Sequence, residues 1–172
     1  MKIFQIITRT DLGGAQSVVV NLANELCKDH EVIVAAGEGD GKMWKLLAPS
    51  IKREEISSLH RALSPINEIK TLFALRRLYG KYKPDIIHLH SSKVGILGRI
   101  AFPKLKIVYT VHGFDSIRIA YRQYLPLERI LQGYCKMIVG VSEYDGWNLR
   151  GEGIRRNVRV IYNGISIPCA LG

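Results

Sequence analysis

The sequence predicts an α/β fold with a doubly wound, mainly parallel sheet of about seven strands and helices on both faces. Two observations lead to this prediction. Short apolar runs rich in β-branched residues alternate along the chain with stretches that have helical periodicity. The strand-like runs are almost continuously hydrophobic, which is typical of parallel strands that helices cover on both sides.

Each expected strand is an apolar run bounded by turn-forming residues. The runs are 2–8, 31–36, 51–56, 85–90, 107–112, 137–141 and 158–162. A helical pattern separates each run from the next. The helical segments are 14–28, 43–47, 65–82, 93–101, 127–135 and 143–150. Because every strand is linked to the next through a helix, right-handed crossovers place the strands parallel in one sheet.

Local chemistry sets several of these boundaries. Pro84 disfavours the helical conformation at Lys83 and so ends the third helix. Ser142 can cap the last helix, which begins at Glu143. No stretch rich in glycine, proline and serine divides the chain, so these elements belong to one domain.

Composition narrows the class of protein. Hydrophobic residues make up 47% and charged residues 23% of the 172 residues, values typical of a globular protein. We find neither a secretion signal nor an apolar run long enough to span a bilayer, so we expect a cytoplasmic protein. The cysteines at 27, 135 and 169 are odd in number and lack CxxC spacing, which indicates reduced thiols.

The net charge of +10 is unevenly distributed. Residues 1–60 carry seven Lys and Arg against eight Asp and Glu, so the whole excess lies in the rest of the chain. Such an excess indicates an anionic partner: phosphate groups, an acidic membrane surface or nucleic acid. We do not expect nucleic acid, because no nucleic-acid motif is present and the basic residues are scattered over several elements.

Two adjacent glycines, which lack side chains, lie between the first strand and the first helix. Gly13 and Gly14 precede Ala15 in the segment DLGGAQ. The first N–H groups of a helix are unpaired and attract phosphate, and glycines let a ligand approach them closely. The segment matches neither the dinucleotide fingerprint GxGxxG nor a P-loop, and a plain tight turn stays open as the alternative.

Three histidines stand near the ends of two later strands. His88 and His90 share one face of the fourth strand, which is followed by Ser91 and Lys93. His112 ends the fifth strand, directly before a glycine. In a sheet of order 3-2-1-4-5 the first strand lies beside the fourth, and ligands bind outside the carboxyl ends there. We therefore predict that the turns after strands one, four and five border one cleft.

The three imidazoles are not equivalent. We expect His88 to be a packed residue of the strand interior and His112 to be the functional one, while His90 can be either. Zinc is not favoured, because two ligands on one strand face need further ligands and none stands nearby in the sequence.

The helix expected over 65–82 carries part of the positive charge. Helical spacing places Lys70, Arg77 and Lys81 on one face, and apolar residues spread over the rest. We interpret it as a core-packed helix with a solvated polar face.

A second basic segment is 113–126, which mixes Arg118 and Arg122 with aromatic residues. We expect a loop here. Arginines and aromatic rings on a loop suit a lid over a ligand or contact with an anionic lipid surface.

Five segments together resemble the N-terminal half of a family 4 glycosyltransferase with the GT-B fold. They are TRTDLGGAQSVVVNLANEL, KPDIIHLHSSKVGILGRIA, VYTVHGF, IVGVSEYD and VRVIYNGI. These segments follow one another in the family's order and spacing. Such enzymes have two Rossmann-like domains facing a cleft and transfer a sugar from a nucleotide-diphosphate donor, usually with retention and without metal.

The resemblance implies roles for individual residues. Gly13, Gly14 and Ala15 correspond to backbone that approaches the donor diphosphate or the transferred sugar. His112 corresponds to the histidine that lines the sugar pocket at the reaction centre. The residues on the acceptor side are His90, Ser91, Lys93, Arg118 and Arg122. The residues where the chain leaves for the second domain are Asn163 and Gly164.

The chain departs from the family in one large respect. The family's donor-binding half, with its E-x7-E pair of glutamates, follows the NG stretch, and no two glutamates here have that spacing. The sequence thus resembles the N-terminal Rossmann-like domain alone, over residues 1–165, with 166–172 as the start of an interdomain linker.

The resemblance implies sugar transfer from a nucleotide-diphospho-sugar to a glycan or lipid-linked acceptor, in surface polysaccharide or glycolipid synthesis. This chain would be inactive alone and would use no metal or other cofactor. The excess of positive charge leads us to expect a lipid-linked or membrane-proximal acceptor at the inner face of the plasma membrane, in contact with anionic lipid. Two alternatives stay open: an inverting GT-B enzyme, and a non-catalytic nucleotide- or partner-binding Rossmann-like module. An NAD-linked oxidoreductase is disfavoured, because the first loop lacks the third glycine and no acidic residue closes the second strand.

Overall fold

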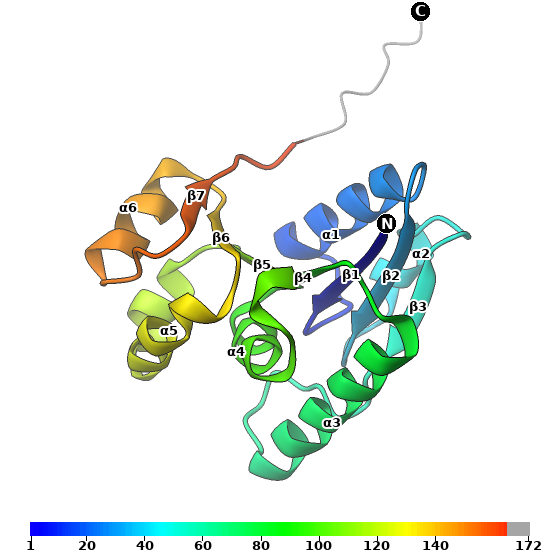
Figure 1. Cartoon of the computed structure of the whole chain (residues 1–172), viewed down its shortest axis with the longest axis horizontal. Coiled ribbons are helices and arrows are strands. Elements are labelled where there is room, and N and C mark those ends of the chain that lie inside the picture. The colour runs from blue at the N-terminus through cyan, green and yellow to red at the C-terminus, as the bar shows by residue number, and fades with distance from the viewer. Residues whose placement is uncertain (165–172) are drawn as a thin grey trace, which may run out of the picture.

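Seven strands pair in one parallel sheet of order β3-β2-β1-β4-β5-β6-β7 in this computed structural model, which describes residues 1–164 (Figure 1). The strands are β1 (Lys2–Ile7), β2 (Glu31–Ala36), β3 (Lys52–Glu55), β4 (Ile86–His90), β5 (Ile107–Val111), β6 (Met137–Gly140) and β7 (Val158–Val160). All expected strands are present. The first lies beside the fourth, which confirms the predicted doubly wound topology.

Helices cover both faces of the sheet (Figure 1). They are α1 (Gly14–Leu26), α2 (Lys42–Leu46), α3 (Pro65–Tyr82), α4 (Ser92–Ala101), α5 (Leu125–Leu131) and α6 (Glu143–Gly151). A small core that includes Val19, Ala23 and Met43 joins α1 and α2 to one face. A larger core joins α3 through α6 to the other face, with Leu75 of α3 and Leu149 of α6 among its members.

The register of the central strands decides where their ends lie. Ile7 of β1 pairs with His90 of β4, and His90 pairs with Thr110 of β5. The carboxyl ends of these three strands are therefore level. The turns that follow them lie along one edge of the sheet, at the point where the strand order reverses.

Two glycines let α4 pack closely on the sheet beside this edge. A Cβ atom on Gly95 would come within 2.5 Å of the Tyr109 ring, and one on Gly98 within 2.5 Å of a Leu89 methyl group. No side chain fits in so little space. The position of α4, and of the turn that leads into it, is fixed by these contacts.

The expectation of a loop over 113–126 is wrong. The segment contains a π-helical turn, Ser116–Ala120, and a 3-10 turn, Arg122–Tyr124, before α5 begins. Phe114 and Ile117 are buried in the larger core and anchor these turns. Residues three apart share one side of a helical turn, so the two anchors favour helical backbone over a mobile loop.

The outward face of α3 also differs from the prediction. The residues of α3 that face the core are Thr71, Leu75, Leu78 and Tyr82. The outward side is not purely polar, since Ile66, Ile69 and Phe73 are 66%, 55% and 67% exposed. Helical spacing puts them on the same side as Lys70 and Arg77, so this side is both apolar and basic.

Three further expectations concern a membrane span, the cysteines and the interdomain linker. Within residues 1–164 no helix combines the length and the apolar character that crossing a bilayer requires. Cys27 and Cys135 are free thiols. Cys169 and the linker expected over 166–172 lie outside the described residues.

Candidate functional site

Three histidine rings lie against one another toward the carboxyl ends of β4 and β5, and we call them the histidine stack. The ring centroids of His88 and His90 are 3.9 Å apart, and those of His90 and His112 are 5.4 Å apart with the planes tilted by 21°. His90 Nδ1 and His112 Nε2 lie 3.1 Å apart, within hydrogen-bond distance. His88 Nε2 lies 2.7 Å from Thr110 Oγ1, so His88 is a packed and hydrogen-bonded residue as expected.

Burial keeps these imidazoles neutral. It lowers the pKa of both His88 and His112 to about 4, and it lowers the pKa of His90 well below the ordinary value. The carboxylate of Asp145 acts in the opposite direction on the pKa of His112. A neutral imidazole has one donor and one acceptor nitrogen, so near pH 7 the rings form hydrogen bonds without carrying charge.

The surroundings of His90 favour one arrangement of protons. His90 is fully buried, and its Nε2 has no hydrogen-bond partner among the described residues. A buried N–H without an acceptor is costly, which favours the proton on Nδ1, where it is donated to His112 Nε2. The proton of His112 then resides on Nδ1. His112, only partly buried, can present this N–H to a ligand.

A side-chain contact joins the turn after β1 to the turn after β4. Thr8 Oγ1 and Ser91 Oγ lie 2.7 Å apart. Ser91 has φ 143° and ψ 155°, a conformation almost restricted to glycine, which costs about 1–3 kcal/mol for other residues. The hydrogen bond from Gly95 N to Ser91 O, 2.7 Å long, holds this backbone in place. Strained residues of this kind cluster at functional sites.

The N-terminus of α1 opens on the same edge. Gly13 precedes the helix in an extended conformation, and within the described residues no side chain caps the first turn and no acidic residue stands in it. A Cβ atom on Gly14 would meet nothing within 4 Å. The fold itself therefore does not require glycine at 14, whereas a ligand lying against the N–H groups of Gly14 and Ala15 would.

Asp145 of α6 is a site residue that the sequence analysis missed. Its Oδ1 accepts a hydrogen bond of 2.9 Å from the Phe114 backbone N–H, and its Oδ2 accepts one of 2.7 Å from Ser142 Oγ. Asp145 thus fixes the turn that follows His112. In the sequence it is the third residue after a helix-capping serine, a position where an acidic residue is common for helix stability alone.

The ammonium of Lys93 is bound by groups of the protein itself, whereas we expected a free cation on the acceptor side. Its ammonium donates to His60 O at 2.5 Å and to Ala62 O at 2.7 Å, and pairs with Glu68 at 2.6 Å. It therefore ties the start of α4 to the loop before α3. Its role toward an acceptor stays a prediction.

Both predicted arginines of the 113–126 segment are paired. Arg118 contacts Asp115 at 2.8 Å, and Arg122 contacts Glu152 at 3.1 Å. The exposed Arg122 pair is weak and can exchange for an anionic ligand. The predicted hinge residues, at 163 and 164, are exposed and follow β7.

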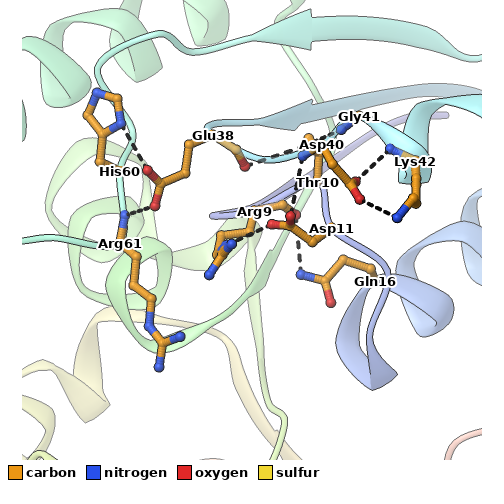
Figure 2. A network of polar contacts seen from close by, with 10 residues as sticks. All are labelled: Arg9, Thr10, Asp11, Gln16, Glu38, Asp40, Gly41, Lys42, His60 and Arg61. Carbon is orange, nitrogen blue, oxygen red and sulfur yellow. Dashed lines mark hydrogen bonds and ion pairs between the residues drawn. The ribbon is translucent and has the colours of Figure 1, made fainter.

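A network of charged and polar groups fills the other half of this edge, in the loops after β1, β2 and β3 (Figure 2). Glu38 accepts hydrogen bonds from the Arg61 backbone N–H at 2.6 Å and pairs with His60 at 3.2 Å. Asp11 pairs with Arg9 at 2.8 Å. The Arg61 N–H and His60 both help to hold the pKa of Glu38 below its usual value, so this carboxylate is charged near pH 7.

Beside this network lies a cavity of about 470 Å³ with a polar lining. It is lined by Thr10, residues 37–41, Trp44, Glu55, Ser57 and His60. None of the predicted site residues takes part. The segment GEGDG at 37–41 was the available signal, because glycines and acidic residues at the end of a strand are typical of a binding loop.

Comparison with known proteins decides the family. The model of Glycosyltransferase Family 4 matches residues 12–167. The chain belongs to glycosyltransferase family 4. A galactosyltransferase of Escherichia coli, named for the acceptor α-D-GlcNAc-diphosphoundecaprenol, is 34% identical over 64% of this chain and 31% of its own length. A Campylobacter jejuni N-acetylgalactosaminyltransferase, named for a diphospho-undecaprenol-linked glycan, is 32% identical over 98% of the chain and 46% of its own length. This family 4 chain thus spans less than half of either relative.

Solved structures share the fold of this family 4 chain at low sequence identity. Anabaena HepE in complex with UDP and glucose has a TM-score of 0.75 at 20% identity, with 96% of this chain and 45% of HepE covered. A sucrose-phosphate synthase from Thermosynechococcus elongatus has a TM-score of 0.74 at 15% identity, with 94% of this chain and 47% of the synthase covered. The predicted Rossmann-like half of a GT-B fold is confirmed.

Proposed function

We propose that this chain is the acceptor-side domain of a retaining glycosyltransferase, which transfers a sugar from a nucleotide-diphospho-sugar to a lipid-linked glycan at the inner face of the plasma membrane. The product would enter surface polysaccharide or glycolipid synthesis. The reaction would need no metal or other cofactor. The observation that carries the proposal is the placement of the uncapped N-terminus of α1 and the histidine stack of β4 and β5 at the same edge of the sheet, where Thr8 and Ser91 join the turns after β1 and β4.

Each part of this edge suits one part of the substrates. The free N–H groups at Gly14 and Ala15 and the partial positive charge of α1 suit a diphosphate. The neutral imidazole of His112 can donate from Nδ1 to a sugar hydroxyl near the anomeric carbon without a charge of its own. Fully buried His90 would act through His112. Ser91 and Lys93 would border the acceptor.

The positive groups that stabilise a departing nucleoside diphosphate usually supply a large share of transition-state stabilisation. In the family these groups lie mostly on the donor-binding half, for which the chain has no matching glutamate pair. We therefore expect the 172-residue chain to bind an acceptor but to show negligible transfer and weak nucleotide affinity. Closure of a second domain would exclude water from the sugar.

The names of two relatives guide the choice of acceptor, since both refer to sugars joined to undecaprenol through a diphosphate. Calorimetry with a short-chain polyprenyl-diphosphate-linked GlcNAc should show saturable binding to the chain. Addition of EDTA should leave this affinity unchanged. Arg122→Ala, on the acceptor side, should weaken the binding, whereas the control Arg155→Ala, at an exposed position before β7, should not. Absence of binding, or equal loss in both variants, would contradict the proposal.

Turnover separates this proposal from its alternatives. Transfer by the isolated chain at a rate comparable to a full-length family enzyme would refute the need for a second domain. A product of inverted anomeric configuration from the complete protein would indicate an inverting enzyme. Affinity for a nucleotide or a protein without any affinity for the glycan diphosphate would favour a non-catalytic binding module.

A further inference from the structure

The outward face of α3 combines large apolar side chains with free cations. We define the α3 face as Ile66, Ile69, Lys70, Phe73, Arg76 and Arg77, which fall on one side of the helix at its 3.6-residue period. All six are exposed. The apolar members lie toward the N-terminal half of the helix and span about 10 Å of it, while Arg76 and Arg77 extend the face toward the C-terminal end.

This concentration of apolar area is not required by the fold. Phe73 is 67% and Ile66 is 66% exposed, and Leu63 in the preceding loop is 65% exposed. Single exposed apolar side chains are common, but several in one row on a helix indicate a surface that something covers. The core of the protein is already served by the opposite side of α3, with Leu75 and Leu78.

The charge on this face is positive without compensation. Lys70, Arg76 and Arg77 take part in none of the ion pairs found within residues 1–164. The acidic residue of α3, Glu68, points to the other side and pairs with Lys93. A partner for the α3 face must therefore accept apolar side chains and be negatively charged.

The α3 face begins close to the candidate site. In a parallel sheet α3 starts at the carboxyl edge, where the histidine stack lies. The contacts of Lys93 with His60, Ala62 and Glu68 join the start of α3 directly to the turn after β4. A flat partner lying on the α3 face would thus extend to within a short reach of that turn.

We infer that the α3 face docks the protein on an anionic lipid bilayer, with Ile66, Ile69 and Phe73 in the headgroup and acyl boundary and the cations against lipid phosphates. Amphipathic surface helices of this composition bind membranes in this way. The inference deepens the proposed function and rests on its lipid-linked acceptor. A bilayer is the partner that matches on both counts, since its surface is negatively charged and its interior takes apolar side chains.

Vesicle co-sedimentation of the 172-residue chain tests the inference. We expect binding to phosphatidylcholine vesicles that contain phosphatidylglycerol and little binding to phosphatidylcholine alone. Each cation near an anionic surface contributes about a fivefold change in affinity. Reversing two charges with Lys70→Glu and Arg77→Glu should therefore reduce binding by at least about 25-fold. Ile66→Ser with Phe73→Ser should abolish the binding that persists in high salt.

Matched variants keep the test specific. Trp147→Ser removes an aromatic side chain with the same 67% exposure from α6, which lies far from α3 (Figure 1). Arg155→Glu with Arg156→Glu lowers the net charge by the same amount on exposed positions near β7. Both controls should retain vesicle binding. All substituted side chains are exposed, and circular dichroism should show that each variant folds.

Three results would overturn the inference. They are equal binding to both vesicle types, equal loss in the control and α3 variants, and a dimer that sedimentation shows to dissociate when Phe73 is changed to serine. The last would assign the α3 face to a second copy of the chain. Since vesicle binding needs no acceptor and no turnover, loss of vesicle binding with intact binding of the soluble acceptor analogue would reject the docking surface alone.

Discussion

The two halves of the carboxyl edge are built on opposite principles. After β4 and β5, His88, His90 and His112 form a stack that is buried, uncharged and fixed by the strands themselves. In the loops after β1, β2 and β3, charged side chains form ion pairs and hydrogen bonds, such as Asp11 with Arg9 and Glu38 with the Arg61 backbone N–H, beside a polar cavity (Figure 2). The buried half can hold a hydrogen-bonding group at a fixed position, while the charged half can rearrange around a ligand.

The largest expected effect that separates the two halves is acid destabilisation. The pKa of His88 is about 4 in the folded chain against 6.5 for a free imidazole, so the unfolded chain binds more protons between these values. Stability should therefore fall as the pH falls from 6.5 to 4, by about 3 kcal/mol from His88 alone. Urea denaturation at a series of pH values measures this slope.

His88→Gln should flatten that slope, while His30→Gln, on an exposed turn, should not. His90 and His112 should keep part of the slope, because burial lowers their pKa values as well. A slope in His88→Gln as steep as that of the unchanged chain would contradict a neutral, buried His88.

Truncating the centre of the stack should be the next largest effect. His90→Ala removes a fully buried ring and its hydrogen bond to His112, which should lower the free energy of unfolding by about 2–4 kcal/mol. Differential scanning calorimetry provides the measurement. A decrease in the free energy of unfolding smaller than that of an ordinary surface substitution would contradict the buried, hydrogen-bonded position of His90.

Substitution of Gly14, at the turn before α1, should change stability and ligand affinity in opposite directions. Gly14→Ala introduces a better helix former where a Cβ has open space, so the chain should become more stable by up to about 1 kcal/mol. The same Cβ should weaken affinity for a sugar diphosphate ligand at the α1 N-terminus. Thermal melting and calorimetry on one sample report both. Unchanged affinity would exclude close approach of the ligand to this backbone.

The smallest effect is expected in the charged half. Glu38→Gln keeps the shape of the side chain and weakens exposed contacts only, so stability should change by less than about 1 kcal/mol and the difference should shrink in salt. Urea denaturation in low and high salt checks this. A loss as large as that from His90→Ala would remove the contrast between the halves.

The sequence was most informative about the positions of the strands and of the turns that follow them. Alternating apolar runs located every strand, and the reversal of strand order placed His90 and His112 on the same edge as the turn at Gly13. These features depend on periodicity and on the handedness of crossovers, both of which are local or general rules.

What the sequence could not predict depends on contacts between distant segments. Helical spacing alone did not reveal which side of α3 faces the core, so the exposure of Ile66 and Phe73 was not predicted. The pairing of Arg122 with Glu152 joins residues thirty positions apart, and no local pattern marks it. The role of Asp145 was hidden for a similar reason, since a helix cap explains the same residue.

The central claim is that the imidazole of His112 and the N-terminus of α1 serve one ligand. Nuclear magnetic resonance of the ¹⁵N-labelled chain, titrated with UDP-glucose as the nucleotide-diphospho-sugar, tests it most directly, because this method also detects weak binding. The account predicts that the ring nitrogens of His112 and the amides of Gly14 and Ala15 shift together with one dissociation constant. Shifts confined to one of these places, or saturating at different ligand concentrations, would contradict it.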